Sequence, residues 1–282
     1  MKTYTLHPFI ALLILLLSFS SCKKKGCTDP TAENYAADAK KDDGSCTYKD
    51  QATITLKFSH NFNGTAVSAA DFDQLKYTNA DGNILSITKL QYLISDVRFY
   101  RANGDSLTIN GYHLIDLQDT NSFNYVLSQA VATNPFIGIG FNYGFDEEDN
   151  ISGQYADLNA ESWSSPEMLG GGYHQMKLEG RYIAGSGDTV SYQYHNLSRI
   201  RQINGTDTTF HPNYVHIDLP HSFSFSDNTT IELKMNINEW FQNPNIWDLD
   251  SMYTMLMPNY DAQVMMTENA YSVFSVGAVT EE

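Results

Sequence analysis

A short segment of this sequence, SSPEMLGGGYHQMKLEG at residues 164–180, combines residue types that bind soft metals. Three consecutive glycines lead into a strand-like run in which His174, Met176 and Leu178 occupy alternate positions. Alternate residues of a strand point to one face of a sheet, so the three side chains are expected to share a face. Imidazole and thioether groups bind copper, and thioethers suit Cu(I) in particular. The segment therefore indicates either core packing or a copper site.

Two further histidines fall near the ends of predicted strands. His60 closes the apolar face of ITLKFSH, and His195 lies near the end of SYQYHNL. Strand ends of a β-sandwich lie along common edges, where residues distant in sequence can converge. We expect His60, His174 and His195 to bind copper at such an edge; for any one of them alone, the alternative is a hydrogen-bonded structural role. The methionine-rich segment MYTMLMP (252–258) is interpreted as a core or loop packing element, with a copper-binding segment as the alternative.

An acidic loop offers a different kind of site. The segment FDEEDN (145–150) contains Asp146, Glu147, Glu148 and Asp149. Carboxylate oxygens suit a hard cation such as Ca²⁺. A solvated loop without a metal is the alternative.

Several function classes find no support. The sequence contains no nucleophile elbow, HExxH motif, P-loop or dinucleotide fingerprint, so we do not expect an enzyme. The formal net charge is −16. Nucleic-acid binding requires a basic surface, so nucleic acid is not an expected partner.

The N-terminus predicts export. A lysine, an apolar stretch and small residues precede Cys22, as in a bacterial lipoprotein signal, which implies cleavage after residue 21 and lipidation of Cys22. Ordinary secretion is the alternative. Three lysines follow the cysteine instead of an acidic run. We expect a lipid anchor in the bacterial envelope, in the outer membrane facing the periplasm.

Residues 22–49 form a polar segment with its own cysteine pair. An exported chain meets oxidising conditions, so Cys27 and Cys46 are expected to form a disulfide. The segment resembles a small cysteine module of surface proteins from marine bacteria of the Bacteroidetes type. Its Asp29, Asp42 and Asp43 are candidate calcium ligands, although a stapled spacer is the preferred interpretation.

The rest of the chain, residues 50–282, predicts an all-β fold. Many short alternating segments rich in tyrosine and phenylalanine are separated by turn signals such as Asn-Gly at 204–205. This pattern is typical of an antiparallel β-sandwich. Short helices are expected only in the connections, at residues 69–75, 121–131 and 236–244.

A series of motifs in this region resembles the MbnP-like family. They are LKFSHNFNG (56–64), ITKLQYLISDVRFY (87–100), FDEEDN after IGIGFNYG, the segment from Trp163 to Gly180, and YHNL (194–197). Members are periplasmic or lipid-anchored β-sandwich proteins associated with copper and encoded beside di-haem, peroxidase-like partners. The resemblance covers residues 52–279.

The resemblance implies particular roles for single residues. His60 and His195 match family histidines, and Trp163 matches a tryptophan that a di-haem partner could oxidise to a kynurenine-like product near the metal. A second family tryptophan before the Gly172–Tyr173 pair is absent, since Leu169 to Gly171 stand there. The alternative function is a metal-free structural or ligand-binding surface lipoprotein, with many tyrosines as well as Trp240 and Trp247 available for sugar or protein contacts, although aromatic residues more often fill cores.

Overall fold

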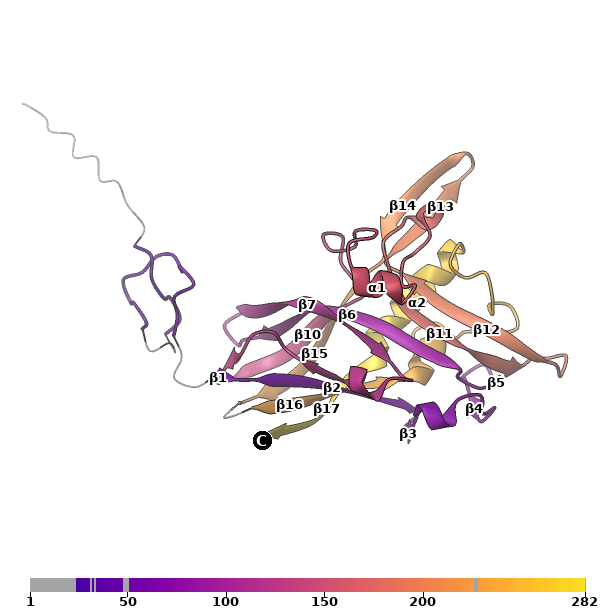
Figure 1. The fold of residues 1–282 in the computed structure, drawn as a ribbon, viewed down its shortest axis with the longest axis horizontal. Coiled ribbons are helices and arrows are strands. Elements are labelled where there is room, and N and C mark those ends of the chain that lie inside the picture. Colours follow the sequence, from indigo (N-terminus) through magenta and orange to yellow (C-terminus); the bar gives the residue numbers. More distant parts are fainter. Residues whose placement is uncertain (1–23, 31, 33, 48–50, 226–227, 282) are drawn as a thin grey trace, which may run out of the picture. The chain divides into compact units, whose positions relative to one another are not determined.

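The computed structural model describes residues 24–30, 32, 34–47, 51–225 and 228–281. The signal segment and Cys22 lie outside these residues, so their predicted processing stays a prediction. The chain divides into two compact units, Met1–Lys49 and Asp50–Glu282. Figure 1 shows the ribbon of both units. Within the described residues, no helix is long and apolar enough to cross a membrane.

The small N-terminal unit is stapled by the predicted disulfide. Cys27 and Cys46 are bonded at an S–S distance of 2.03 Å, which confirms the pairing. A crosslink over this separation contributes about 3 kcal/mol in the chain-entropy account. Asp42 and Asp43 accept hydrogen bonds from the backbone amides of Gly44 and Ser45, at 3.0 and 3.1 Å, and so close their own turn.

The larger unit is built on an eight-stranded sheet. Its central path runs β15-β10-β6-β11-β5-β4, with β12 added to β11 and β7 added to β6. The strands are β4 (Tyr77–Thr78), β5 (Ile84–Leu85), β6 (Lys89–Tyr100), β7 (Ser106–Asp116), β10 (Phe136–Tyr143), β11 (His174–Ile183), β12 (Thr189–Leu197) and β15 (Val215–Phe223).

A second, five-stranded sheet completes the sandwich. Its path is β17-β16-β2-β3, with β8 paired to β2. The strands are β2 (Ile54–Phe62), β3 (Thr65–Ala66), β8 (Asn124–Val126), β16 (Thr229–Asn236) and β17 (Phe274–Glu281). β2 and β16 pair in parallel, whereas the other strand pairs of both sheets are antiparallel. The all-β sandwich is therefore confirmed, with one parallel pair inside it.

Two short pairs complete the strand inventory. They are β1 (Gln51–Ala52) with β9 (Val131–Ala132), and the hairpin β13 (Arg199–Asn204) with β14 (Asp207–Pro212). The hairpin turns at the Asn-Gly signal of residues 204–205, where Gly205 has a φ of 65°. Asn204 pairs with Asp207, so Gly205 is the first of the two central residues, and a glycine with positive φ at this position is typical of a type II′ hairpin turn. The turn prediction is therefore confirmed, although its flanking strands were not predicted.

The main core lies between the sheets and takes its side chains from alternate positions. In β2, the inward residues Ile54, Leu56 and Phe58 are at most 1 % exposed. A smaller apolar cluster contains Leu93, Phe145, Leu158, Trp163 and Tyr173. This second cluster lies on the other face of the large sheet, because Leu93 of β6 alternates with Tyr92 of the main core.

Helices occur between strands, but only in part where they were expected. They are η1 (Ala69–Asp71), η2 (Thr120–Phe123), α1 (Ala156–Ala160), η3 (Glu167–Leu169), η4 (Ile237–Phe241) and α2 (Tyr260–Val273). The predictions at 69–75 and 236–244 correspond to short 3₁₀ helices. The helix predicted over 121–131 is wrong beyond its first turn, because residues 124–126 form β8 and pair with β2.

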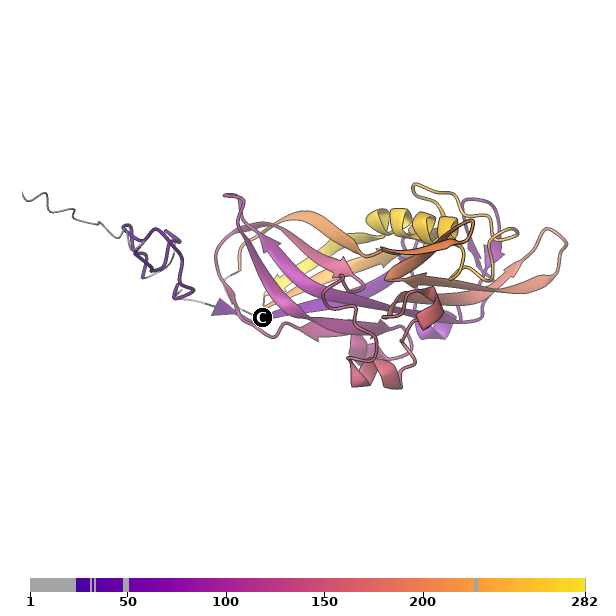
Figure 2. The same cartoon turned by 90° about the horizontal axis from the view of Figure 1, so that it is seen from above.

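The longest helix, α2, was not predicted, and its buried side explains why. Gln263 and Asn269 are fully buried there beside Ala262, Met266 and Ala270, so the apolar 3.6-residue pattern is interrupted. Figure 2 shows α2 (yellow) on one side of the large sheet and α1 (red) on the other. Thus α2 covers the main core and α1 the smaller cluster.

Candidate metal site

A β-bulge at the start of β11 decides where His174 points. His174 is opposite Leu197 of β12, whereas Met176 is opposite Asn196, so one extra residue stands in β11. A bulge of this kind breaks the alternation of side chains. Met176 and Leu178 face the main core, whereas His174 turns to the outer face that carries Lys177 and His195. The prediction that His174 shares a face with Met176 is therefore wrong.

The chain segment before β11 brings Trp163 to the same place. The carbonyl of Trp163 accepts hydrogen bonds from the His174 amide at 3.0 Å and from His174 Nδ1 at 2.8 Å. The ring centroids of Trp163 and His174 are 5.8 Å apart. Gly170, Gly171 and Gly172 all have positive φ, a conformation that glycine adopts without strain. The triple glycine thus forms the turn that folds Trp163 back onto His174.

His195 completes a compact group on this face. Its ring centroid lies 5.7 Å from that of His174, with the rings at 82° to each other. Its Nε2 lies 2.9 Å from Glu179 Oε1. The hydrogen bond from His195 is the main reason why the pKa of Glu179 is lowered, so the carboxylate is ionised and accepts the proton of Nε2.

These hydrogen bonds leave one nitrogen of each imidazole available. A carbonyl only accepts, so Nδ1 of His174 carries the proton and Nε2 keeps its lone pair. His195 donates from Nε2 to the Glu179 carboxylate, so Nδ1 is the nitrogen that this hydrogen bond leaves free. Metal-binding histidines commonly donate their second nitrogen to a carboxylate or a backbone carbonyl. Burial, with a smaller contribution from Lys177, lowers the pKa of His174 to about 3, so this imidazole is neutral at physiological pH.

The separation of the two rings fits a shared metal. A metal about 2 Å from one nitrogen of each imidazole leaves the ring centroids roughly 5 to 6 Å apart, and the observed 5.7 Å lies in this range. His174 and His195 could therefore hold a copper ion together. A bound copper ion would supply a centre that exchanges one electron between Cu(I) and Cu(II).

Trp163 occupies a cationic and dry environment beside the pair. Its ring is fully buried, and Nε1 has no hydrogen-bond partner among the described residues. Lys177 Nζ lies 4.9 Å from the Trp163 ring centre and donates to the Ser162 carbonyl at 2.7 Å. Burial, and then the charge of Lys89, lowers the pKa of Lys177. An indole in this position is rigidly held within reach of the His174 ring.

His60 does not join this group. It lies in β2 of the other sheet, where its Nε2 is 3.1 Å from the Tyr92 hydroxyl and its ring packs on Phe123. Burial lowers the pKa of His60 to about 4. Across the described part of the chain, histidines contribute to no cluster of three or more potential ligand atoms within 4.8 Å. The three predicted copper ligands thus divide into a pair and a separate buried histidine.

Helix α2 positions His195 through a residue that sequence reasoning missed. Gln263 donates from Nε2 to the His195 carbonyl at 2.7 Å, and its Oε1 accepts from the Leu197 amide at 2.9 Å. The side chain therefore pairs with the edge of β12 as another strand would. A glutamine in a helix gives no sequence signal for such a role.

Comparison with known proteins places this architecture in a family. The sequence profile of the MbnP family matches residues 51–259. The chain belongs to the MbnP family. A search of curated proteins gives no match. The fold also matches the solved structure of MbnP from Methylosinus trichosporium, with a TM-score of 0.52 and 13 % sequence identity over 81 % of this chain and 99 % of that one. At this identity the second match concerns the fold alone.

The tryptophans named for the alternative of a sugar- or protein-binding surface are buried in this MbnP-family chain. Trp163, Trp240 and Trp247 are each 0 % exposed. Trp240 and Trp247 belong to the main core, where they pack on Tyr194. The tryptophans therefore stabilise the fold and offer no surface for a ligand.

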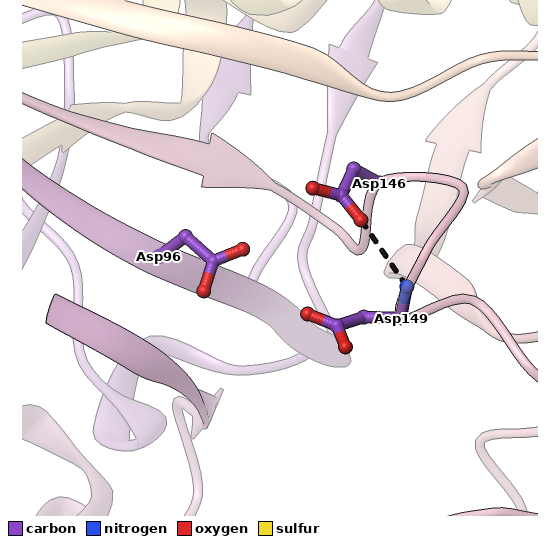
Figure 3. Close-up of side chains that lie close together, drawn as sticks. All are labelled: Asp96, Asp146 and Asp149. Carbon is purple, nitrogen blue, oxygen red and sulfur yellow. Dashed lines mark hydrogen bonds between the residues drawn. The ribbon is translucent and has the colours of Figure 1, made fainter. Parts of the chain in front are cut away.

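The acidic loop contributes to a second cluster of candidate ligands. Asp146 and Asp149 meet Asp96 of β6, and one carboxylate oxygen of each lies within 4.8 Å of the others. Figure 3 shows Asp96 facing the two loop residues, with Asp146 also accepting from the Asp149 amide. The three aspartates line a surface pocket. Glu148 also lines this pocket, whereas Glu147 does not. Asp96 was not predicted because it stands in an apolar strand.

The charges around Asp96 show that the three carboxylates repel one another. Burial first, and then the charges of Asp149 and Asp146, raises the pKa of Asp96, while Arg98 opposes this. Asp96 has a φ of 49° at the register shift of β6, which turns its side chain toward the loop. The side-chain amide of Asn142 donates a hydrogen bond to Asp96 at 3.2 Å, so one oxygen of this buried carboxylate has a hydrogen-bond partner.

Proposed function

We propose that this MbnP-family protein binds one copper ion through His174 and His195 and serves to store, buffer or deliver it without catalysing a reaction of its own. The observation that carries the proposal is the pair of imidazoles with ring centroids 5.7 Å apart, each held by an acceptor on one ring nitrogen that leaves the other nitrogen free. Imidazole is a good copper ligand. The family's association with copper points the same way.

Trp163 is the residue through which a partner would act on this site. Opening of an indole, with oxygen atoms from water, electrons passed to the partner, and one ring carbon released as formate together with protons, gives an amine and a carbonyl. These groups can bind a metal, whereas the intact indole offers only an N–H donor. The buried Nε1 without a partner lies beside His174. Because Trp163 is fully buried, a di-haem partner would have to remove electrons from it across intervening residues.

Pulsed electron paramagnetic resonance of the Cu(II)-loaded protein tests the proposal. The wild-type signal should report two coordinated imidazoles, and His174→Ala or His195→Ala should report one, with His221→Ala as the matched control. Mass spectrometry of the Trp163 peptide from native and recombinant protein would show whether oxidation accompanies binding. Two imidazoles in both histidine variants would contradict the assignment, and the absence of specifically bound Cu(II) in wild type would favour the metal-free surface lipoprotein.

A second proposal concerns the carboxylate cluster. We propose that Asp96, Asp146 and Asp149 bind Ca²⁺, which would relieve their mutual repulsion and fasten the acidic loop to β6. Support comes from the convergence of these carboxylates from two separate segments and from the burial of Asp96. Ca²⁺ accepts irregular sets of oxygen ligands.

The location of the protein remains a proposal from the sequence. We propose that Cys22 carries a lipid that anchors the protein in the outer membrane, facing the periplasm. The lipoprotein-like signal supports this assignment. Fractionation of Cys22→Ser should move the protein from the membrane to the soluble fraction; an unchanged membrane fraction would contradict it.

A further inference from the structure

A methionine-lined pocket adjoins the copper-site residue His195. The cavity has a volume of about 340 Å³ and is lined by Met168, Met255, Met257 and His195 among others. Met168 is 71 % exposed and Met255 is 73 % exposed. Side chains this exposed do not fill a core, so the packing role expected for segment 252–258 does not describe Met255. The pocket therefore combines thioethers and an imidazole at the protein surface.

The backbone holds the exposed methionines at this place. Met255 has a φ of 56°, in the left-handed region that few residues other than glycine adopt. Met168 lies in η3, immediately before the triple-glycine turn. Trp163 precedes η3 in the chain, and His174 follows the turn. Arg201 donates to the Met168 carbonyl at 3.4 Å. Two separate segments, η3 and residues 255–257, thus place methionines at one cavity. The side chains of Met168 and Met255 are largely exposed there.

The lining selects among cations by softness and charge. Thioethers prefer Cu(I) over hard divalent ions, and no carboxylate lines this pocket. Arg201 is the charged residue of the lining, and its repulsion of a divalent ion is twice that of a monovalent ion at the same distance. Pro258, Leu169 and Leu256 supply apolar walls that a weakly hydrated ion tolerates. A monovalent soft cation is the metal that this chemistry favours.

We propose that the pocket is a Cu(I)-uptake site in which Met168, Met255 and Met257 receive the ion and pass it to His195. His195 belongs both to the pocket and to the pair with His174, so it joins the two sites. The transfer step rests on the proposed function, whereas Cu(I) binding by the thioethers does not.

Methionine-methyl NMR of the full mature chain, titrated anaerobically with Cu(I), tests the pocket. We expect the methyl signals of Met168, Met255 and Met257 to shift in wild type and equally in His174→Ala. Those of Met252 and Met265, which pack against the core, should not shift. Shifts that persist without tight copper binding at His174 would support the pocket while refuting the proposed function. Unmoved signals of all three pocket methionines would overturn the inference.

The kinetics of copper transfer test the connection to His195. The triple variant M168L/M255L/M257L keeps the apolar volume, so the fold should tolerate it. We expect it to take up Cu(I) from a weak chelator at least about tenfold more slowly than wild type, because the ion can no longer bind to the pocket methionines before it reaches His195. The double variant M252L/M265L should match wild type. Equal rates in the triple variant and wild type would overturn the uptake role.

Discussion

At the scale of single residues, the hydrogen bonds of His174 and His195 decide what they can bind. Each donates one ring nitrogen to a fixed acceptor, and each keeps the other for a ligand. The residue types were evident in the sequence, where Trp163, His174 and His195 lie in consecutive predicted segments. Their grouping was only partly predictable, because the bulge that turns His174 outward has no local signal beyond the glycines before it.

His60 provides a prediction about pH. Burial lowers the pKa of His60 to about 4, from an ordinary value near 6.5, so between these values the unfolded chain binds more protons than the folded one. The free energy of unfolding should therefore fall as the pH drops below about 6.5, by up to about 1.4 kcal/mol per pH unit from this group. Urea unfolding of His60→Gln between pH 7 and 5 should show a shallower loss. A slope equal to that of wild type would show that His60 is not buried in its neutral form.

At the scale of elements, α2 is the support on which β12 depends. Its N-cap is clear, because the Asn259 side chain accepts from the Ala262 amide. Two buried amide side chains of α2 form hydrogen bonds with backbone groups of other segments. Gln263 donates to the His195 carbonyl of β12, and Asn269 donates to the carbonyls of Trp240 and Asn245. Strands such as β2 could be predicted because their apolar period of two extends over many residues. Helix α2 could not be predicted, because the buried amide residues Gln263 and Asn269 interrupt the apolar 3.6-residue pattern that indicates a helix.

These two amides allow a matched test of positioning. Gln263→Ala leaves the buried His195 carbonyl without its donor and should cost about 1–3 kcal/mol of stability. Copper affinity should fall as well, since the strand end that carries His195 loosens. Asn269→Ala should cost a similar amount of stability and leave copper affinity unchanged, because Asn269 donates its hydrogen bonds to Trp240 and Asn245 and not to β12. Chemical unfolding and competitive copper titration measure the two effects; equal copper affinities in both variants would refute the positioning role.

At the scale of the whole sandwich, the two faces of the large sheet carry different tasks. The inner face builds the main core, and the outer face holds the smaller apolar cluster and the candidate copper pair. The sandwich itself was predictable, because alternating aromatic strands and turn signals extend along residues 50–282. The outer layer was not, since it consists of short loops and one-turn helices whose positions depend on contacts distant in sequence.

Calcium should stabilise the sandwich through Asp96. At about one hundred times its dissociation constant, Ca²⁺ would raise the free energy of unfolding by about 2.7 kcal/mol. Asp96→Asn should abolish this gain. It should also stabilise the calcium-free protein, because it removes a buried charge whose pKa is raised by burial and by Asp149. Glu147→Gln is the matched control and should retain the response; a calcium response that survives in Asp96→Asn would contradict the proposed site.

The most direct test of the central proposal is a competitive copper titration of the mature protein under anaerobic conditions. We predict that wild type and His60→Gln bind one equivalent more tightly than a generic surface histidine does, and that the double variant H174A/H195A loses this equivalent. Retention of the tight equivalent in the double variant, or its loss in His60→Gln alone, would contradict the assignment of the metal to His174 and His195.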